Sequence, residues 1–287
     1  MEQEIIIDGK TFSLVSVQRP GTTAVYRCGN LYLRLGAKNE LERDLLLHEQ
    51  MTANGFPVAK ILSKGEYKNY LYFIEESLGE KHFGDLFAED IKNTGNISNS
   101  LFETFLKITN EFATAQLKTA GQRGSVDEFF EGICLATLCK ELPEYAMRIE
   151  KRFSEAMTHL ASFPFVLTHG DFNPHNLYPT GVIDLEDSFF GPAGYDLITN
   201  LVHINYFPPS SDYEFFQEYI FNDDQKQRYL DVVDTLYQSK GLPALSPCLP
   251  DFEFCRAVWS AVKIEKYPKL QKFRYDLLQE KFLKVSS

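Results

Sequence analysis

One stretch, Leu167–Asp184, constrains this chain more than any other part of its 287 residues. Two short apolar runs flank a polar loop in which Asp171 and Asn176 stand five positions apart. The sequence Tyr-Pro-Thr-Gly at 178–181 suits a type I turn, so the chain is predicted to return as a tight hairpin that ends on Asp184. Three oxygen-bearing side chains are therefore expected to meet at one point.

Phosphoryl transfer from a nucleotide requires such a set of groups. One carboxylate accepts or orients the proton of the acceptor hydroxyl, which is the role we assign to Asp171. Mg²⁺ prefers hard oxygen ligands and takes few protein groups, so Asn176 and Asp184 suffice to hold it against the phosphates. Alone, each carboxylate would be read as an ordinary loop or strand-end residue. Together, the three residues indicate a catalytic site.

The motif resembles the signature of the aminoglycoside phosphotransferase and choline kinase family. That signature is His-Gly-Asp-Phe-x-x-x-Asn, then Ile-Asp, then Gly-x-x-x-x-Asp-Leu, and it reads here as 169–176, 183–184 and 191–197. The resemblance implies an α+β, protein-kinase-like fold with two lobes. Residues 1–76 would form a small antiparallel β-sheet lobe that binds nucleotide, and residues 77–287 a larger, mainly helical lobe with the catalytic loop and acceptor site. It also implies Mg²⁺ and ATP as cofactors, with GTP as an alternative phosphate donor.

The remaining polar residues of the motif are expected to have structural roles. The resemblance implies that His169 and Asp196 brace the catalytic loop, and His175 is assigned no role. A protein kinase fits less well, because Gly170 replaces the Arg of that loop and residues 183–185 lack the Asp-Phe-Gly pattern.

The first 76 residues read as short strands around a Gly/Thr loop. The resemblance implies that Gly21, Thr22 and Thr23 lie over the nucleotide phosphates, with Gly21 allowing close approach of the backbone. Without the later motif, this loop would be read as an ordinary turn. Strands are expected at residues 4–7, 11–15, 58–62 and 70–74, and residues 19–26 and 31–35 are expected to form a hairpin that begins with this loop.

Arg34 stands where the family carries a phosphate-contacting Lys or, in some members, Arg. A guanidinium fork can hold phosphate oxygens as well as a carboxylate. A helix is expected at 39–54, and in this family such a helix supplies an acid that pairs with the cation. Counting back from Phe-Pro-Val at 56–58 places this acid at Asp44, with Glu42 and Glu49 remaining as alternatives.

The stretch from Glu75 to Gly79 is expected to cross between the lobes beside the nucleotide base, so Glu75 and Ser77 are included among the nucleotide contacts. Beyond this stretch the apolar pattern predicts helices. They are expected at 100–117, in one or two segments within 126–161, at 195–204 and in three or four segments from 213 onward.

The formal net charge of −11 disfavours nonspecific binding to nucleic acid, which needs a basic surface. No Lys or Arg occurs from Phe153 to Gln225, an interval that contains the motif and many acids. The negative electrostatic potential of these acids favours a small hydroxyl-bearing acceptor that is cationic or polyhydroxylated, although an acidic surface can simply aid solubility. Dense aromatic residues at 206–221 could bind an amine, but packing in the helical core is the favoured interpretation.

No apolar run is long enough to span a membrane, and the acidic N-terminus is unlike a signal peptide, so a cytoplasmic protein is expected. The five cysteines show no metal-binding spacing and are expected to be reduced. The leading hypothesis is an ATP-dependent small-molecule kinase with an alcohol group as acceptor. The alternative is a kinase-like protein that binds nucleotide without catalysing transfer. The oligomeric state is left open.

Overall fold

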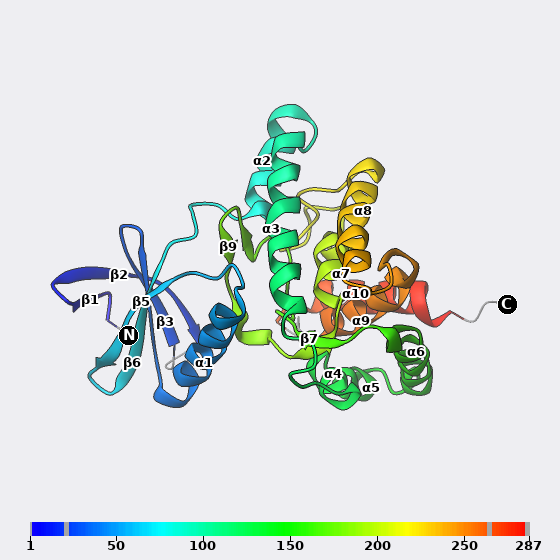
Figure 1. The fold of residues 1–287 in the computed structure, drawn as a ribbon, viewed down its shortest axis with the longest axis horizontal. Helices are drawn as coiled ribbons and strands as arrows, with labels where there is room; N and C mark the ends of the chain where they lie inside the picture. The colour runs from blue at the N-terminus through cyan, green and yellow to red at the C-terminus, as the bar shows by residue number, and fades with distance from the viewer. Residues whose placement is uncertain (1, 20–22, 263–265, 285–287) are drawn as a thin grey trace.

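A small antiparallel sheet and a larger group of helices form two lobes joined by a narrow connection (Figure 1). The computed structural model describes residues 2–19, 23–262 and 266–284. The predicted α+β, kinase-like fold is confirmed. Gly21 and Thr22, two of the residues expected over the phosphates, lie outside the described residues.

The N-terminal lobe contains a six-stranded sheet in its described part, in the order β1-β2-β3-β4-β6-β5. Ile5, Tyr26, Leu33 and Ile74 are buried on one of its faces, as the alternating pattern of apolar residues requires. Helix α1 (Lys38–Asn54) follows β4 and ends at Gly55, which adopts a left-handed conformation. The strands are β1 (Glu4–Ile7), β2 (Lys10–Arg19), β3 (Thr23–Cys28), β4 (Leu31–Gly36), β5 (Ile61–Tyr67) and β6 (Tyr70–Glu76).

Several predicted strand boundaries were wrong. The second strand continues to Arg19 rather than ending at Val15. The fifth strand begins at Ile61 rather than Val58, because Val58 instead forms a bridge with Val182 of the other lobe. The sixth strand continues to Glu76, so Glu75 is a strand residue whose side chain has a fixed direction. It is not part of an irregular crossing between the lobes.

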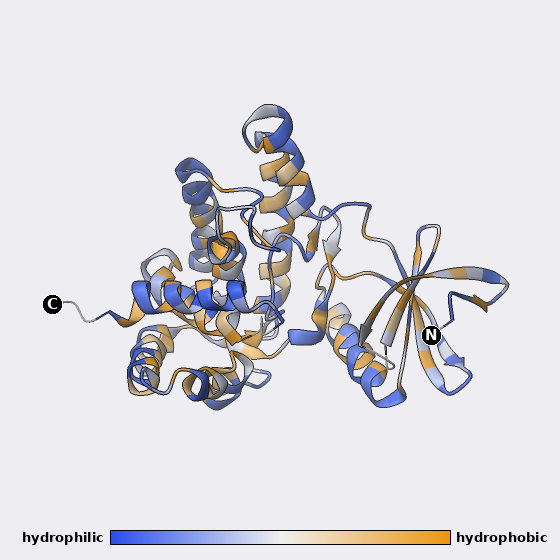
Figure 2. Cartoon of the chain, turned by 180° about the vertical axis from the view of Figure 1, so that it is seen from behind, coloured by the Kyte–Doolittle hydropathy of each residue, from blue (hydrophilic) through white to orange (hydrophobic). Residues whose placement is uncertain are grey.

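The helices of the C-terminal lobe pack around α3, which buries Phe102, Phe105, Ile108 and Phe112 along its length. Figure 2 shows apolar residues along the inner sides of these helices and polar residues on their outer sides. The helices are α2 (Phe83–Thr94), α3 (Asn99–Leu117), α4 (Val126–Gly132), α5 (Leu135–Glu141), α6 (Ala146–His159), α7 (Tyr195–Val202), α8 (Asp223–Ser239), α9 (Leu249–Val262) and α10 (Pro268–Leu278).

One helix prediction also needed correction. The fully described segment 126–161 contains α4, α5 and α6 rather than one or two helices, with Pro143 lying between α5 and α6. From residue 213 onward, where three or four helices were expected, the described residues form three, α8, α9 and α10, and residues 213–221 before them are irregular. Tyr219 and Phe221 from this segment are buried against α2 and α3, so packing of aromatic rings fixes it without helical hydrogen bonds.

The central motif forms the junction between the lobes. Strands β8 (Leu177–Tyr178) and β9 (Gly181–Val182) make the predicted hairpin. The backbone N–H of Val182 donates to the Pro57 carbonyl over 2.7 Å, and the Thr180 hydroxyl donates to the Leu78 carbonyl. The first bond ties the hairpin to the N-terminal lobe and the second ties it to the connection between the lobes. A 3-10 turn (Leu185–Asp187) follows Asp184.

Strands β7 (Phe165–Leu167) and β10 (Phe190–Pro192) pair beneath the catalytic loop. None of the helices in the described ranges is both long and apolar enough to cross a membrane. All five cysteines are free thiols in the structure.

Candidate active site

Asp196 holds the start of the catalytic loop. Its carboxylate accepts hydrogen bonds from the backbone N–H groups of His169, over 2.7 Å, and Gly170, over 3.1 Å, and from the Gln116 side chain, over 2.7 Å. Burial raises the pKa of Asp196 to about 6, although His169 and these bonds oppose the change. The expected bracing role of Asp196 matches this geometry.

Gly170 shows why this loop cannot carry the arginine of a protein kinase. Its φ is +80°, and a Cβ added there would lie 2.0 Å from the carbonyl oxygen of Asp187. Only glycine combines this backbone conformation with such a close approach. The next bracing contact comes from His169, whose Nε2 donates to the Ile183 carbonyl over 2.7 Å and ties the loop to the hairpin.

Asp171 and Asn176 lie in direct contact. Asn176 Nδ2 donates to the backbone carbonyl of Asp171 over 2.9 Å and to its Oδ2 over 3.3 Å. Because these bonds use the amide nitrogen, the carbonyl oxygen Oδ1 of Asn176 remains as the atom that can bind a metal. The Asn173 side chain also donates to the Asp171 carbonyl, over 3.0 Å, so the loop is held closed around its central acid.

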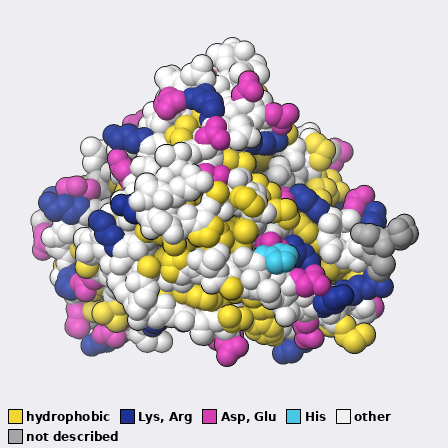
Figure 3. Space-filling model, turned by 45° about the vertical axis from the view of Figure 1, so that its right-hand side comes forward, with side chains coloured by type: hydrophobic (Ala, Val, Ile, Leu, Met, Phe, Trp, Pro, Cys, Tyr) yellow, Lys and Arg dark blue, Asp and Glu magenta, His cyan; other side chains and the backbone are white. Residues whose placement is uncertain are grey.

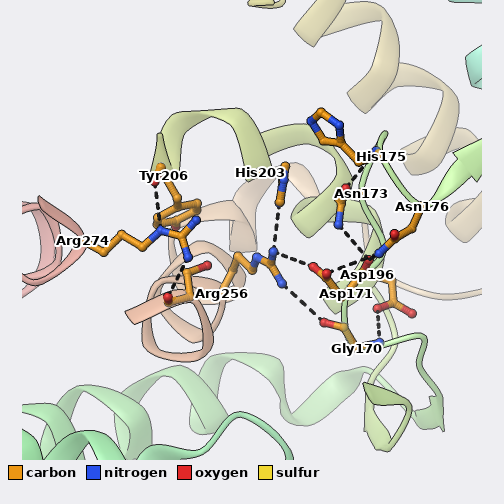
Figure 4. A network of polar contacts seen from close by, with 11 residues as sticks. Gly170, Asp171, Asn173, His175, Asn176, Asp196, His203, Tyr206, Arg256 and Arg274 are labelled. Atoms are coloured by element: carbon orange, nitrogen blue, oxygen red, sulfur yellow. Dashed lines mark hydrogen bonds and ion pairs between the residues drawn. The ribbon is translucent and has the colours of Figure 1, made fainter. Parts of the chain in front are cut away.

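Arg256 of α9 is the strongest partner of Asp171 (Figure 4). Its Nη2 lies 2.8 Å from Oδ1 of Asp171, and the arginine side chain is only 2% exposed. Burial alone would raise the pKa of Asp171, but the charge of Arg256 and its hydrogen bond to the carboxylate hold that pKa well below its ordinary value. Asp171 is therefore ionised at any physiological pH.

Asp184 lies at the lobe junction in a left-handed backbone conformation, with φ of 64°. Burial, followed by the charge of Glu186, raises the pKa of Asp184, whereas Arg34 opposes the shift. Asp171 also contributes to this shift, which shows that the two carboxylates are close enough to interact. A carboxylate in such a crowded acidic setting would be stabilised by a bound cation.

The donor set fits Mg²⁺. The carboxylate of Asp184 and Oδ1 of Asn176 are hard oxygen ligands. The Ile183 N–H donates to the backbone carbonyl of Asn176 over 3.0 Å, which places the two ligands on adjoining segments. No group of three or more His, Cys, Asp or Glu side chains suited to a metal occurs in the described residues. Phosphate and water oxygens would therefore complete the coordination.

Arg34 has a partner that the sequence did not predict. Its Nε donates to Oε1 of Glu75 over 3.0 Å, on the adjacent strand β6. Burial lowers the pKa of Arg34, but Glu75 and then the charges of Asp184 and Asp44 raise it, so the expected helix acid lies nearby. Glu49 instead pairs with Lys64 over 2.7 Å on the outside of the lobe. The pairing of Arg34 with an acid of α1 alone was therefore an incomplete prediction.

A cavity between the lobes is lined by Arg34, Asp44, Glu75 and Asp184, together with apolar residues that include Phe73. Two other predicted nucleotide contacts have different surroundings. The buried Thr23 hydroxyl donates to Glu40 over 3.1 Å, and the Ser77 hydroxyl donates to the Gly79 carbonyl over 3.0 Å. Neither side chain lines this cavity.

A second cleft, of about 490 Å³, opens on the other side of Asp171. Phe207, Phe215 and Phe216 form an apolar wall, and the acids at its rim include Glu214 and Glu218. One face of the molecule shows apolar side chains gathered around its centre, with acidic and histidine side chains beside them (Figure 3). Imidazoles contributed by His82, His175 and His203 also line this cleft.

The sequence model of the phosphotransferase enzyme family matches residues 24–230, which is more than half of the chain. This chain belongs to the phosphotransferase enzyme family. No curated protein matches the chain.

Solved structures of related phosphotransferases share the fold. A choline/ethanolamine kinase family protein from Mesorhizobium loti is 11% identical, with a TM-score of 0.60 over 96% of this chain and 88% of its own. The aminoglycoside phosphotransferase APH(3'')-Id from Streptomyces rimosus is 12% identical, with a TM-score of 0.55 over 87% of this chain and 92% of its own. A second structure of that enzyme contains ADP and streptomycin. At these identities the likeness establishes the fold alone.

Within this phosphotransferase site, Arg256 is the residue that sequence reasoning missed. It lies 85 positions from Asp171, so no local motif includes it. A signal was nevertheless present. Arg256 is the single cation in Phe252–Val262, a segment of α9 that is otherwise mostly apolar. The long interval without Lys or Arg around Asp171 also meant that any counter-charge had to come from elsewhere in the chain.

Proposed function

We propose that this protein is an ATP-dependent small-molecule kinase that transfers the γ-phosphate to an alcohol group. Residues 1–76 would bind the nucleotide, and residues 77–287 would supply the catalytic loop and the acceptor site. The observation that carries the proposal is the meeting of Asp171, Asn176 and Asp184 at the junction of two lobes, with Arg34 facing Asp184 across the cavity.

In the proposed reaction, the acceptor oxygen forms a bond to the γ-phosphorus while the bond from that phosphorus to the β,γ-bridging oxygen breaks. ADP is the leaving group. Asp171 accepts the hydrogen bond of the acceptor hydroxyl and orients its oxygen for attack. Because its pKa is held well below the ordinary range, Asp171 is protonated only transiently by the hydroxyl proton, which it then releases to solvent.

Oδ1 of Asn176 and the Asp184 carboxylate would hold Mg²⁺, which when bound offsets the charge of the phosphates. Arg34 would donate to phosphate oxygens while Glu75 keeps its guanidinium in place. The presence of ADP in the structure of the Streptomyces rimosus enzyme supports a nucleotide as the phosphate donor. ATP is proposed, with GTP as the alternative that must be compared.

The acceptor is proposed to be a small polyhydroxylated or amine-bearing molecule that binds in the second cleft. The rim acids there would attract a cation, and the three phenylalanines would pack against its carbon skeleton. The streptomycin-bound relative supports an acceptor of this kind.

A direct test is phosphoryl transfer from γ-labelled ATP to a panel containing streptomycin, kanamycin, choline, ethanolamine, homoserine and glucose. Transfer should require Mg²⁺, and ADP should form in equal amount to the phosphorylated product. The Asp171→Asn variant is the matched control. Nucleotide binding without Asp171-dependent transfer to any panel member would contradict the proposal.

One observation favours the alternative of a nucleotide-binding protein without turnover. The carboxylate of Asp171 is already engaged by Arg256, which lowers its basicity. Calorimetric titration with Mg²⁺ and a non-hydrolysable ATP analogue, beside the transfer assay, separates the two functions.

A further inference from the structure

The guanidinium of Arg256 bridges two residues of the acceptor cleft (Figure 4). Its Nη2 lies 2.8 Å from Oδ1 of Asp171 and 2.9 Å from Nδ1 of His203. Its Nη1 lies 3.4 Å from the Gly170 carbonyl, and the guanidinium carbon lies 4.1 Å from the centre of the Trp259 ring. Helix α9 therefore reaches the catalytic loop through this single side chain.

These contacts decide the tautomer of His203. A guanidinium can only donate hydrogen bonds, so Nδ1 of His203 must accept and cannot carry a proton. The imidazole is then neutral with its proton on Nε2. Within the described chain, no hydrogen bond to Nε2 of His203 occurs, and His203 lines the acceptor cleft together with Asp171.

The stability of the fold alone does not explain why the guanidinium of Arg256 is buried beside Asp171 and His203. Arg256 is 2% exposed, and its Nε has no hydrogen-bond partner in the described residues. Burying a charged group is costly unless all its donors are paired. The other polar groups near Arg256 are Tyr195, Tyr206 and Arg274, and Arg274 donates to the carbonyls of Tyr206 and Ser260 instead.

We propose that Arg256 is a positioning residue for the acceptor, acting through Asp171 and His203. By occupying Oδ1 of Asp171, it leaves Oδ2 to receive the acceptor hydroxyl beside the 3.3 Å hydrogen bond that Oδ2 already accepts from Asn176. By occupying Nδ1 of His203, it fixes an N–H donor at Nε2 beside that carboxylate. The cleft therefore presents one hydrogen-bond acceptor and one donor together.

This pairing specifies a substrate feature, and it rests on the proposed kinase function. The acceptor carries a second oxygen, or another atom with a lone pair, near the hydroxyl that is phosphorylated. The hydroxyl donates to Asp171, while the second atom accepts from His203. An acceptor without that atom would leave the Nε2–H group of His203 without a partner, which weakens binding.

The tautomer is tested first, by nitrogen NMR of the imidazoles in the full-length protein, with no acceptor required. The chain has six histidines, and His203→Phe identifies the signal of interest by its loss. His203 should show a neutral ring protonated at Nε2 between pH 6 and 8 in the parent protein. A ring protonated at Nδ1 would overturn the proposal whether or not the protein catalyses transfer.

The positioning role is tested with Arg256→Met and Arg256→Lys. Loss of orientation at Asp171 should lower kcat by about 10²-fold in Arg256→Met, with the KM for ATP unchanged. Arg256→Lys should recover part of this loss, and it provides the measurement if Arg256→Met does not fold. A kcat within twofold of the parent value for a folded variant would overturn the proposal.

Arg152→Met is the matched control, because Arg152 makes a 2.7 Å ion pair with Asp251 at the beginning of the same helix α9. It should lower the thermal stability while leaving kcat and the His203 signal unchanged. If the parent protein transfers no phosphate at all, the proposed function fails, and the NMR measurement alone then decides whether Arg256 fixes His203.

Contact between His203 and the acceptor is tested by comparing two amide substitutions, His203→Asn and His203→Gln. His203→Asn keeps an acceptor near the position of Nδ1 but removes the donor at Nε2, whereas His203→Gln places an amide N–H near Nε2. Loss of the single donor should raise the KM for the acceptor by about tenfold in His203→Asn and by less in His203→Gln. Equal acceptor KM values in both variants and the parent would contradict substrate contact by His203.

Discussion

Nε of Arg34 lies 3.0 Å from Oε1 of Glu75, which stands on the neighbouring strand β6 and not on helix α1. Both side chains are largely buried, at 18% and 10% exposure. The proposed phosphate-binding cation is thus held by the sheet itself. Movement of α1 would change the distance from Asp44 without breaking this pair.

Replacing Glu75 with Gln should weaken nucleotide binding and the fold together. The guanidinium of Arg34 would lose its buried counter-charge, at a cost of about 1–3 kcal/mol of unfolding free energy. A less fixed Arg34 should raise the KM for ATP by roughly tenfold, equivalent to about 1.4 kcal/mol. Denaturant unfolding and steady-state kinetics measure the two effects.

The control for this change is Glu49→Gln. Glu49 makes a shorter ion pair with Lys64, but both side chains are about half exposed. Such pairs contribute between about 0 and 1 kcal/mol, so stability should hardly change and the KM for ATP should not change at all. Equal effects of the two variants would show that Glu75 has no special role.

Replacing Asp171 with Asn should lower turnover by about 10²–10⁴-fold, the usual range for lost acid–base assistance, while nucleotide still binds. The variant also leaves Arg256 without its buried partner, so a lower melting temperature is expected in the same protein. Transfer kinetics, nucleotide titration and thermal unfolding should be measured side by side. Full activity of this variant would show that the role assigned to Asp171 is wrong.

Replacing Asp184 with Asn should have a different signature. Because Asp184 is proposed to bind Mg²⁺, the affinity for the Mg²⁺–nucleotide complex and the turnover should fall together. Raising the Mg²⁺ concentration should restore part of the activity. Nucleotide binding measured without Mg²⁺ should stay close to that of the parent protein, and a large loss there would argue against metal ligation.

The sequence was sufficient to predict the two lobes, through the family resemblance of its motif, and the central hairpin, because turn chemistry is local. It was not sufficient for boundaries that tertiary contacts decide. Val58 has an apolar pattern that suits a strand, but its bridge to Val182 connects the lobes instead. The aromatic residues at 213–221 were expected to pack in the helical core, and rings of this segment do pack against α2 and α3, but the backbone there is irregular, which the sequence did not show.

In the candidate site, too, local sequence predicts some residues and tertiary contacts decide others. Asp171, Asn176 and Asp184 could be named from the sequence because one short loop and hairpin bring them together. Arg256 could not, and neither could the pairing of Glu75 with Arg34, since the partners lie on different elements and the choice depends on which charges are buried together. A lone arginine in an apolar helix indicates that a buried acid exists, but not which one.

The carboxyl group of Asp196 is predicted to make a contribution to the free energy of unfolding that decreases as the pH rises, opposite to the usual behaviour of an acid. Its pKa is raised from 3.8 to about 6, mainly by burial, so the folded protein binds a proton more tightly than the unfolded chain does. This contribution to stability is therefore fully present below about pH 4 and is lost as the pH rises to about 6. A shift of this size corresponds to about 3 kcal/mol.

Other acids titrate over the same range, so the contribution of Asp196 must be isolated with Asp196→Asn. The asparagine cannot ionise, and its amide N–H₂ cannot accept from the loop N–H groups, so the variant should be less stable at every pH. The quantity to measure is the difference in unfolding free energy between parent and variant by urea denaturation. That difference should shrink between pH 4 and 6 and stay level from 6 to 8. A difference that grows with pH over the lower interval would mean that the three hydrogen bonds to Asp196 outweigh its burial.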